Sequence, residues 1–205
     1  MNGMNFYGEN QNNGQSKSIN LKKNSTLNLS KERLSRVVLG LGWDLAINGK
    51  SCDLDASAFL LDKFNQCPNS SYAILYVEGH EKGYGVSYGG DNKTGAGEGD
   101  DETIDVNLSQ VPNNVEKIVF VASIYEAINK RQNFGQVRNA YLRLVNMDNN
   151  KEIARFSLTD DYSTCQSVIM GALERTNNSW SFRAIGEGIQ GELDTVICRF
   201  GLSSE

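Results

Sequence analysis

Short stretches of alternating apolar and polar residues fill most of the chain after residue 17. A period of two is typical of β-strands with one buried face, and these stretches are too short for most helices. The most hydrophobic of them, 117–124, is expected to be a central strand. The other expected strands cover 37–43, 54–61, 72–77, 103–108, 141–145, 153–158, 168–173 and 180–185.

Turn-forming residues between these stretches predict hairpins. The expected turns are Lys23-Asn24, Asp148-Asn149-Asn150 and Asn177-Asn178-Ser179. The first hairpin would pair Ile19 and Leu21 with Leu27 and Leu29.

The last element has a helical period. One helix face is formed by Leu193, Val196, Ile197 and Phe200, and Gly201 stands where a C-cap is expected. Many short strands, two prolines and one terminal helix predict a mainly β fold, an antiparallel β-sandwich with a short C-terminal helix. The sandwich domain is expected to span 18–205. Residues 1–17, rich in Asn, Gly and Gln, are expected to form a disordered N-terminal tail.

Charge and cysteine usage narrow the class of protein. The 205 residues carry a net charge of −5 without a basic stripe, which argues against a nucleic-acid partner. The four cysteines are far apart and His80 is the single histidine, so a zinc site is not expected. The N-terminus lacks the apolar core of a secretory signal, and no apolar run reaches the roughly 20 residues of a transmembrane segment. A cytoplasmic protein with reduced thiols is expected.

The run 91–102 (DNKTGAGEGDDE) is the most unusual segment. It holds five carboxylates and one lysine, a net charge of −4 in a chain whose total is −5. Gly95, Gly97 and Gly99 let the backbone turn sharply and expose its carbonyls. Carboxylate and carbonyl oxygens suit a hard cation such as Ca²⁺, and without one the charges would repel each other. The alternative is a solvated surface loop. An EF-hand does not fit, because Lys93 and Gly95 stand at ligand positions.

A second group of acids lies around the start of the strand 54–61. Asp53 and Asp55 are two residues apart, so on a strand their carboxylates point to the same side. Burial of both without a partner would be costly, so they are expected at a sheet end, beside a cation or facing water. Asp44 either joins them or bonds nearby backbone amides. Glu126 either adds a further carboxylate or caps a helix.

Catalytic motifs are missing from the sequence. It has no GxSxG or Walker sequence and no histidine near a cysteine, so no catalytic residue is assigned and an enzyme is not expected. Two other functions stay open. One is a phosphoesterase in which Asp53, Asp55 and the acidic run hold Mg²⁺ or Mn²⁺, although no base or phosphate-binding cluster of Lys and Arg is evident. The other is an interaction module without a metal.

Five motifs occur in the order found in one protein family. They are Gly40–Asp44 (GLGWD), Asp53–Phe59 (DLDASAF), Gly90–Glu102, Asn133–Val137 (NFGQV) and Arg183–Gly188 (RAIGEG). With them the chain resembles the TerD family of tellurium-resistance and stress-response proteins, from about residue 18 to residue 202.

The resemblance implies a β-sandwich that binds Ca²⁺ in an acidic cleft between loops, without known catalysis. The metal ligands that it implies are Asp55, Asp91, Asn92, Gly97, Asp100, Asp101 and Glu102, with Asp44 and Asp53 as further candidates. Because acids from two segments outnumber the charge of one ion, two Ca²⁺ ions are expected. The resemblance also implies a bacterial stress response and other Ter-type proteins, some membrane-associated, as partners. The protein would then be cytoplasmic and in part peripheral at the inner membrane face.

Overall fold

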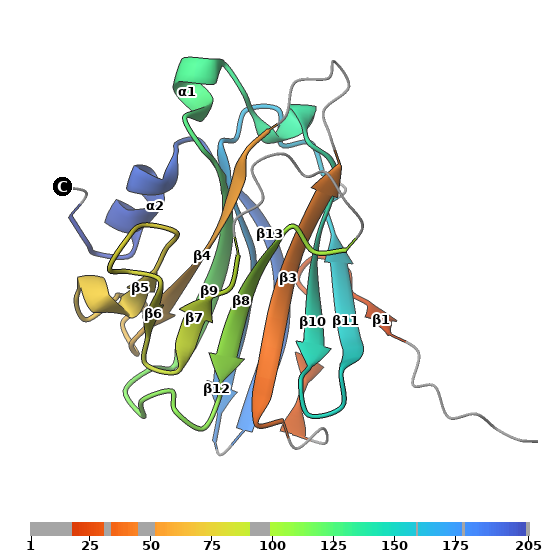
Figure 1. Ribbon diagram of the computed structural model, residues 1–205, viewed down its shortest axis with the longest axis vertical. Coiled ribbons are helices and arrows are strands. Elements are labelled where there is room, and N and C mark those ends of the chain that lie inside the picture. The colour runs from red at the N-terminus through yellow and green to blue at the C-terminus, as the bar shows by residue number, and fades with distance from the viewer. Residues whose placement is uncertain are drawn as a thin grey trace, which may run out of the picture.

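The computed structural model describes residues 18–30, 34–44, 52–90, 99–158, 160–177 and 179–203. These residues form two β-sheets that pack face to face, which confirms the predicted mainly β sandwich (Figure 1). The predicted N-terminal tail, 1–17, lies outside the described residues.

The first sheet has seven strands within the described ranges, in the order β1-β11-β10-β3-β8-β7-β6. β1 lies parallel to β11, and the other neighbours in this sheet are antiparallel. The strand bounds are Ile19–Asn20 (β1), Arg36–Asp44 (β3), Lys82–Gly83 (β6), Val86–Tyr88 (β7), Glu102–Asn107 (β8), Arg138–Asn146 (β10) and Lys151–Ser157 (β11).

The second sheet has six strands in the described part of the chain, in the order β2-β13-β12-β9-β4-β5, all antiparallel. Its strands are Thr26–Asn28 (β2), Leu54–Leu61 (β4), Ala73–Ile74 (β5), Lys117–Ile124 (β9), Ser167–Thr176 (β12) and Ser179–Ile189 (β13). β9 lies between β12 and β4, so the central position expected from its hydrophobicity is confirmed.

The core lies between the two sheets and extends under the C-terminal helix. Every residue of β4 is buried, so alternate side chains face the other sheet or the outer side. On the outer side, Phe59 packs against Phe200 with a distance of 4.8 Å between ring centroids. Phe200 directly follows α2 (Leu193–Arg199), the predicted C-terminal helix, whose Val196 is buried. Gly201 follows with a φ of +82°, a left-handed conformation that favours glycine at a helix end.

The other described helical segments are shorter. They are the single-turn helix α1 (Ala127–Lys130) and the 3₁₀ turns η2 (Ser70–Tyr72) and η3 (Phe134–Gln136). The side chain of Asn133 accepts a hydrogen bond from Gly135 N and caps η3, whereas Glu126 precedes α1 without a side-chain cap. In the described part of the chain, no helix has the length and apolar character needed to cross a membrane.

Two local predictions were wrong. Ile19 and Leu27 do not share a hairpin, because β1 pairs with β11 in the first sheet and β2 pairs with β13 in the second. The turn at Lys23-Asn24 instead carries the chain from one sheet to the other. The run 72–77 forms a strand only at β5. Tyr72 ends a 3₁₀ turn that Asn69 caps, and after β5 the chain turns, with His80 N donating to Val77 O over 3.0 Å.

Candidate functional site

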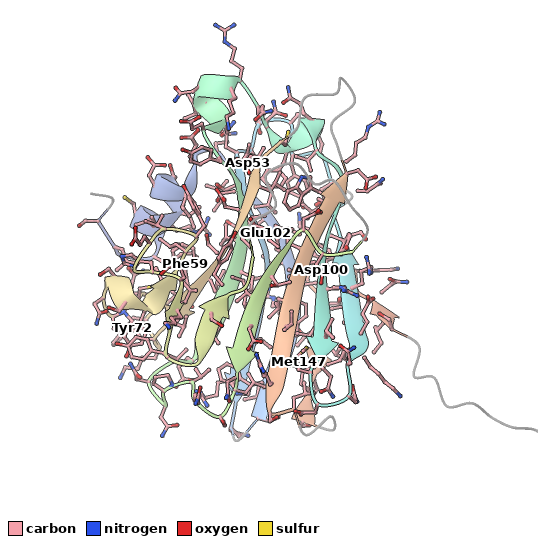
Figure 2. The ribbon with its side chains drawn as sticks, viewed as in Figure 1. Asp53, Phe59, Tyr72, Asp100, Glu102 and Met147 are labelled. Carbon is pink, nitrogen blue, oxygen red and sulfur yellow. The ribbon has the colours of Figure 1, made fainter. Side chains whose placement is uncertain are left out.

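The candidate acids gather at one end of the sandwich. β3 ends there at Asp44, β4 begins after Asp53, and β8 begins at Glu102. Figure 2 shows Asp53 at this end near α1, with Glu102 and Asp100 further along the first sheet. The predicted ligands Asp91, Asn92 and Gly97 lie outside the described residues.

At this end of the sandwich, hydrogen bonds with the backbone hold Asp101 in place. Its Oδ2 accepts a hydrogen bond of 2.9 Å from Trp43 N, and its own N–H donates to Leu41 O over 2.8 Å. Burial raises the pKa of the Asp101 carboxyl, and the charges of Asp100 and Asp44 raise it further. The hydrogen bond from Trp43 N lowers this pKa, but by less than burial and the two charges raise it. The surroundings of Asp101 therefore disfavour its negative charge.

Asp44 lies on the same side of the site as Asp101. It is exposed, and its Oδ2 accepts a bond of 2.6 Å from the side-chain amide of Asn139. The sequence leaves open a bond from backbone amides to Asp44; the bond observed comes instead from a side chain. Its charge still acts on Asp101, so both carboxylates belong to one electrostatic group.

A second group of acids surrounds Tyr76. Burial is the main cause that raises the pKa of the Tyr76 hydroxyl to about 12, and the charges of Asp55, Asp53 and Glu126 add to it. Asp55 is 5% exposed on β4, where it lies opposite Ser123 of β9. The described acids at this end thus fall into two groups, one beside β3 and β8 and one beside β4 and β9.

Glu102 points into the interior. Its side chain is 1% exposed, and its Oε1 accepts a bond of 2.7 Å from the Tyr88 hydroxyl of β7. Its Oε2 accepts a bond from the backbone N–H of Ala56. Ala56 belongs to β4, and the ladder of β4 with β5 covers only Ala58 and Phe59. Glu102 therefore links the two sheets where that ladder ends.

Asp100 lies on the outer face of the first sheet. Its side chain is 9% exposed, and its Oδ1 accepts a bond of 2.7 Å from Arg143 Nε. The carboxylate rests on Gly40, where any Cβ would collide with Asp100 Oδ2. The Tyr141 ring covers Gly42 in the same way, and its hydroxyl bonds Gly99 O over 2.7 Å. The alternate glycines of β3 thus form a trough that Asp100 and Tyr141 fill.

The ion pair of Asp100 continues into a network on β11. Arg143 Nη1 lies 3.4 Å from Glu152 Oε2, and Arg155 Nη2 lies 2.8 Å from the same oxygen. Ser18, just before β1, donates to Glu152 Oε1 over 2.7 Å. Burial by itself would raise the pKa of Glu152, but the bonds from Arg155 and Ser18 and the nearby guanidinium charges lower it to about 2.

Glu152 should therefore make the protein sensitive to acid. A folded-state pKa below the ordinary value of 4.5 contributes stability above pH 4.5, which is lost as the pH falls toward 2. We expect the wild type to lose about 1–2 kcal/mol more than Glu152→Gln between pH 5 and pH 2 in urea unfolding, after allowance for partial solvent screening. Glu116→Gln, at an exposed residue before β9, is the control. Parallel curves for the wild type and Glu152→Gln would contradict the prediction.

The chemistry of the donor set fits a hard cation. The described candidates offer carboxylate oxygens, and burial raises the pKa of the nearby Cys52 thiol, which keeps it protonated at neutral pH. Among the described residues, no group of three or more His, Cys, Asp or Glu side chains is arranged to hold a metal ion. A metal centre at this end thus needs donors beyond the described ones, and the sequence offers Asp91, Asn92 and Gly97.

Several residues at this end were not found by sequence reasoning. Arg143, Tyr141 and Tyr76 were assigned only to strands, and Glu152 and Tyr88 received no role. The alternate glycines Gly40 and Gly42 were the available signal, because bare positions on one strand face leave room for side chains from neighbouring segments.

Comparison with known proteins decides the family. The sequence profile of the TerD domain matches residues 17–200. The chain belongs to the TerD family. The tellurium resistance protein TerD of Serratia marcescens is 43% identical over 190 residues, which cover 91% of this chain and 99% of that protein. General stress protein 16U of Bacillus subtilis is 45% identical over 188 residues, 90% of this chain and 97% of that protein.

Two solved structures share the fold. A homologue of the telluride resistance protein TerD from Streptomyces coelicolor superposes with a TM-score of 0.64 at 17% identity, covering 80% of this chain and 95% of that chain. The crystal structure of a protein of unknown function, SAV2460, gives the same TM-score at 19% identity, covering 82% and 96%. At these identities the likeness concerns the fold alone.

Proposed function

We propose that this TerD-family protein is a non-catalytic stress-response protein whose acidic end binds Ca²⁺ and thereby orders a surface for a partner. The relatives named for tellurium resistance, general stress and resistance to chemical damage support the stress-response part. The calcium part is supported by one observation above all. Asp101 is kept where burial and two neighbouring carboxylates disfavour its charge, and a divalent cation would remove that penalty.

The residues that would hold the ion are oxygen donors. Asp101, Asp44 and the Gly97 carbonyl, with Asp91 and Asn92, would serve one ion, and Asp53 and Asp55 a second ion beside Tyr76. When bound, Ca²⁺ supplies positive charge that cancels the repulsion among these acids. Two ions agree with the division of the described acids into two electrostatic groups.

The partner surface would be this end of the sandwich in its calcium-ordered form. Other Ter-type proteins, including membrane-associated ones, are the proposed partners, and the cytoplasm with the inner membrane face is the proposed location. The relatives named TerZ and TerX in Serratia marcescens, 37% and 34% identical to this chain, support a set of such proteins.

Calcium should stabilise the protein measurably. At a free concentration of 100 times the Kd, one bound ion adds about 2.7 kcal/mol, which is a rise of roughly 5–10 °C in Tm for a domain of this size. We expect thermal melts in Ca²⁺ and in EGTA to differ by this amount, with a smaller shift in Mg²⁺, and isothermal titration to give the stoichiometry. Superimposable melts and no heat of binding would refute calcium binding.

A further inference from the structure

The face of the second sheet that carries α2 holds a groove of about 350 Å³ beside the C-terminal end of that helix. This volume falls within the range usual for small-molecule sites, about 300–1,000 Å³. The groove is lined by residues of β9, β12 and β13, by the end of α2 and by the segment that follows β4. None of the described residues that line it belongs to the acidic end.

The floor of the groove is apolar. Val119 of β9 is the direct partner of Phe59 in the ladder of β4 with β9, so it points to the outer face on which Phe59 meets Phe200. Ile169 of β12 and Ile185 of β13 line the groove beside it. Val119 and Ile169 are buried and Ile185 is half-buried, so the charged side chains around the groove stand above them. An apolar part of a ligand would be removed from water here.

The rim is charged and carries one more positive charge than negative charges. Lys117, Arg183 and Arg199 supply three cations, and Glu174 and Glu187 supply two carboxylates. Arg199 Nη2 donates to Glu187 Oε1 over 2.7 Å, which completes that pair. Glu174 Oε1 is shared, because it lies 3.4 Å from Lys117 Nζ and 3.9 Å from Arg183 Nη1. Both distances exceed the length of about 2.7–2.9 Å usual for a charge-assisted hydrogen bond, so one carboxylate neutralises two cations incompletely.

Arg183 is the rim cation with the weakest described partner. Its nearest carboxylate, that of Glu174, is 3.9 Å away, whereas Lys117 also donates to Asn65 Oδ1 over 3.2 Å. The Arg183 side chain is 43% exposed, so its guanidinium can be reached from solvent. A guanidinium presents several N–H donors in one plane, an arrangement that matches the oxygens of a carboxylate or a sulfonate.

The groove also gives a role to a motif that the acidic end does not use. The run Arg183–Gly188 is the last of the five family motifs in the chain and belongs to β13. Its alternate residues Arg183, Ile185 and Glu187 all line the groove. One strand thus contributes a cation, an apolar surface and an acid to the same site.

We propose that this groove binds a small organic anion, with its apolar body on Val119, Ile169 and Ile185 and its acidic head on Arg183 and Lys117. Charge and surface together carry this assignment. A neutral apolar ligand would leave the extra positive charge of the rim uncompensated, and an inorganic anion would leave the apolar floor without a partner. Binding at this groove makes no use of Ca²⁺, so it is independent of the proposed function.

Fluorescence titration of the full-length protein in EGTA with 1-anilinonaphthalene-8-sulfonate, which joins an aromatic body to a sulfonate, tests the assignment. We expect saturable binding at one site per chain. Octanoate should displace this probe, whereas octanamide, its uncharged counterpart, should need at least about a tenfold higher concentration, because it lacks the charge that Arg183 recognises. Absence of probe binding by the folded protein, or equal displacement by the two compounds, would overturn the assignment.

Three variants locate the site and separate charge from fold. Arg183→Met keeps an apolar stem without the charge and should bind the probe roughly tenfold more weakly. Glu174→Gln removes the carboxylate that competes for both cations and should bind it roughly threefold more tightly. Arg138→Met, at an exposed position on the other sheet, removes the same charge and should stay within about twofold of the wild type.

Circular dichroism melts establish that each of these variants folds before it is titrated. Opposite changes in Arg183→Met and Glu174→Gln would support the groove as the site, because a general loss of structure cannot tighten binding. An Arg183→Met variant that binds as well as the wild type, or a Glu174→Gln variant that binds no more tightly, would contradict it.

Discussion

Replacement of Glu102 by alanine is expected to lower the free energy of unfolding by about 3–4 kcal/mol, a large share of the total stability of a domain this size. The side chain is 1% exposed and bonds Tyr88 of the first sheet and Ala56 of the second. Its removal takes the acceptor from a half-buried hydroxyl and from a buried backbone N–H, and it opens a cavity between the sheets. Urea unfolding monitored by tryptophan fluorescence measures the loss.

Matched variants separate the hydrogen bonds from the charge. Glu102→Gln keeps the shape, can accept from Ala56 N and can donate to Tyr88, so it should cost only about 1 kcal/mol. Tyr88→Phe removes one of the bonds and should also cost about 1 kcal/mol. Glu116→Ala, at an exposed residue, should stay within about 0.5 kcal/mol of the wild type. If Glu102→Ala were no less stable than Glu116→Ala, Glu102 would not be a link between the sheets.

The fold was largely predictable because the sandwich depends on local patterns. The run 117–124 is apolar over nearly its whole length, β4 carries no Lys, Arg or Glu, and α2 has an apolar face at helical spacing, so their burial follows from the sequence. The hairpin at 19–29 was not predictable in the same way. Its strands have only two and three residues, and the choice between pairing with each other and pairing with the longer β11 and β13 depends on distant residues.

The site shows a different limit. The sequence identifies Asp100, Asp101 and Glu102 as three adjacent acids, but their side chains reach Arg143, Trp43 and Ala56 respectively. Strict alternation would place Asp100 and Glu102 on the same face. It does not apply here, because β8 begins only at Glu102 and Gly99 precedes it with a φ of +109°. Charge counting therefore overstates how many carboxylates one ion can contact, and only the tertiary structure separates them.

Replacement of Asp101 by asparagine is expected to have opposite effects on the two states of the protein. The side-chain oxygen of the asparagine can still accept the bond from Trp43 N, but the side chain carries no charge. In Ca²⁺, the loss of a direct ligand should weaken binding by at least about 100-fold, as measured by isothermal titration. In EGTA, the variant should be at least as stable as the wild type, because the environment of Asp101 disfavours its negative charge.

The pH dependence distinguishes this explanation from a general loss of fold. Because the folded-state pKa of Asp101 is raised above 3.8, its contribution to stability is present below pH 3.8 and is lost as the pH rises through the folded-state value. In EGTA, the stability of the wild type relative to Asp101→Asn should thus decline between pH 3 and pH 7, whereas Glu116→Gln should run parallel to the wild type. A variant that loses stability in EGTA and keeps its affinity for Ca²⁺ would show that Asp101 is structural and not a metal ligand.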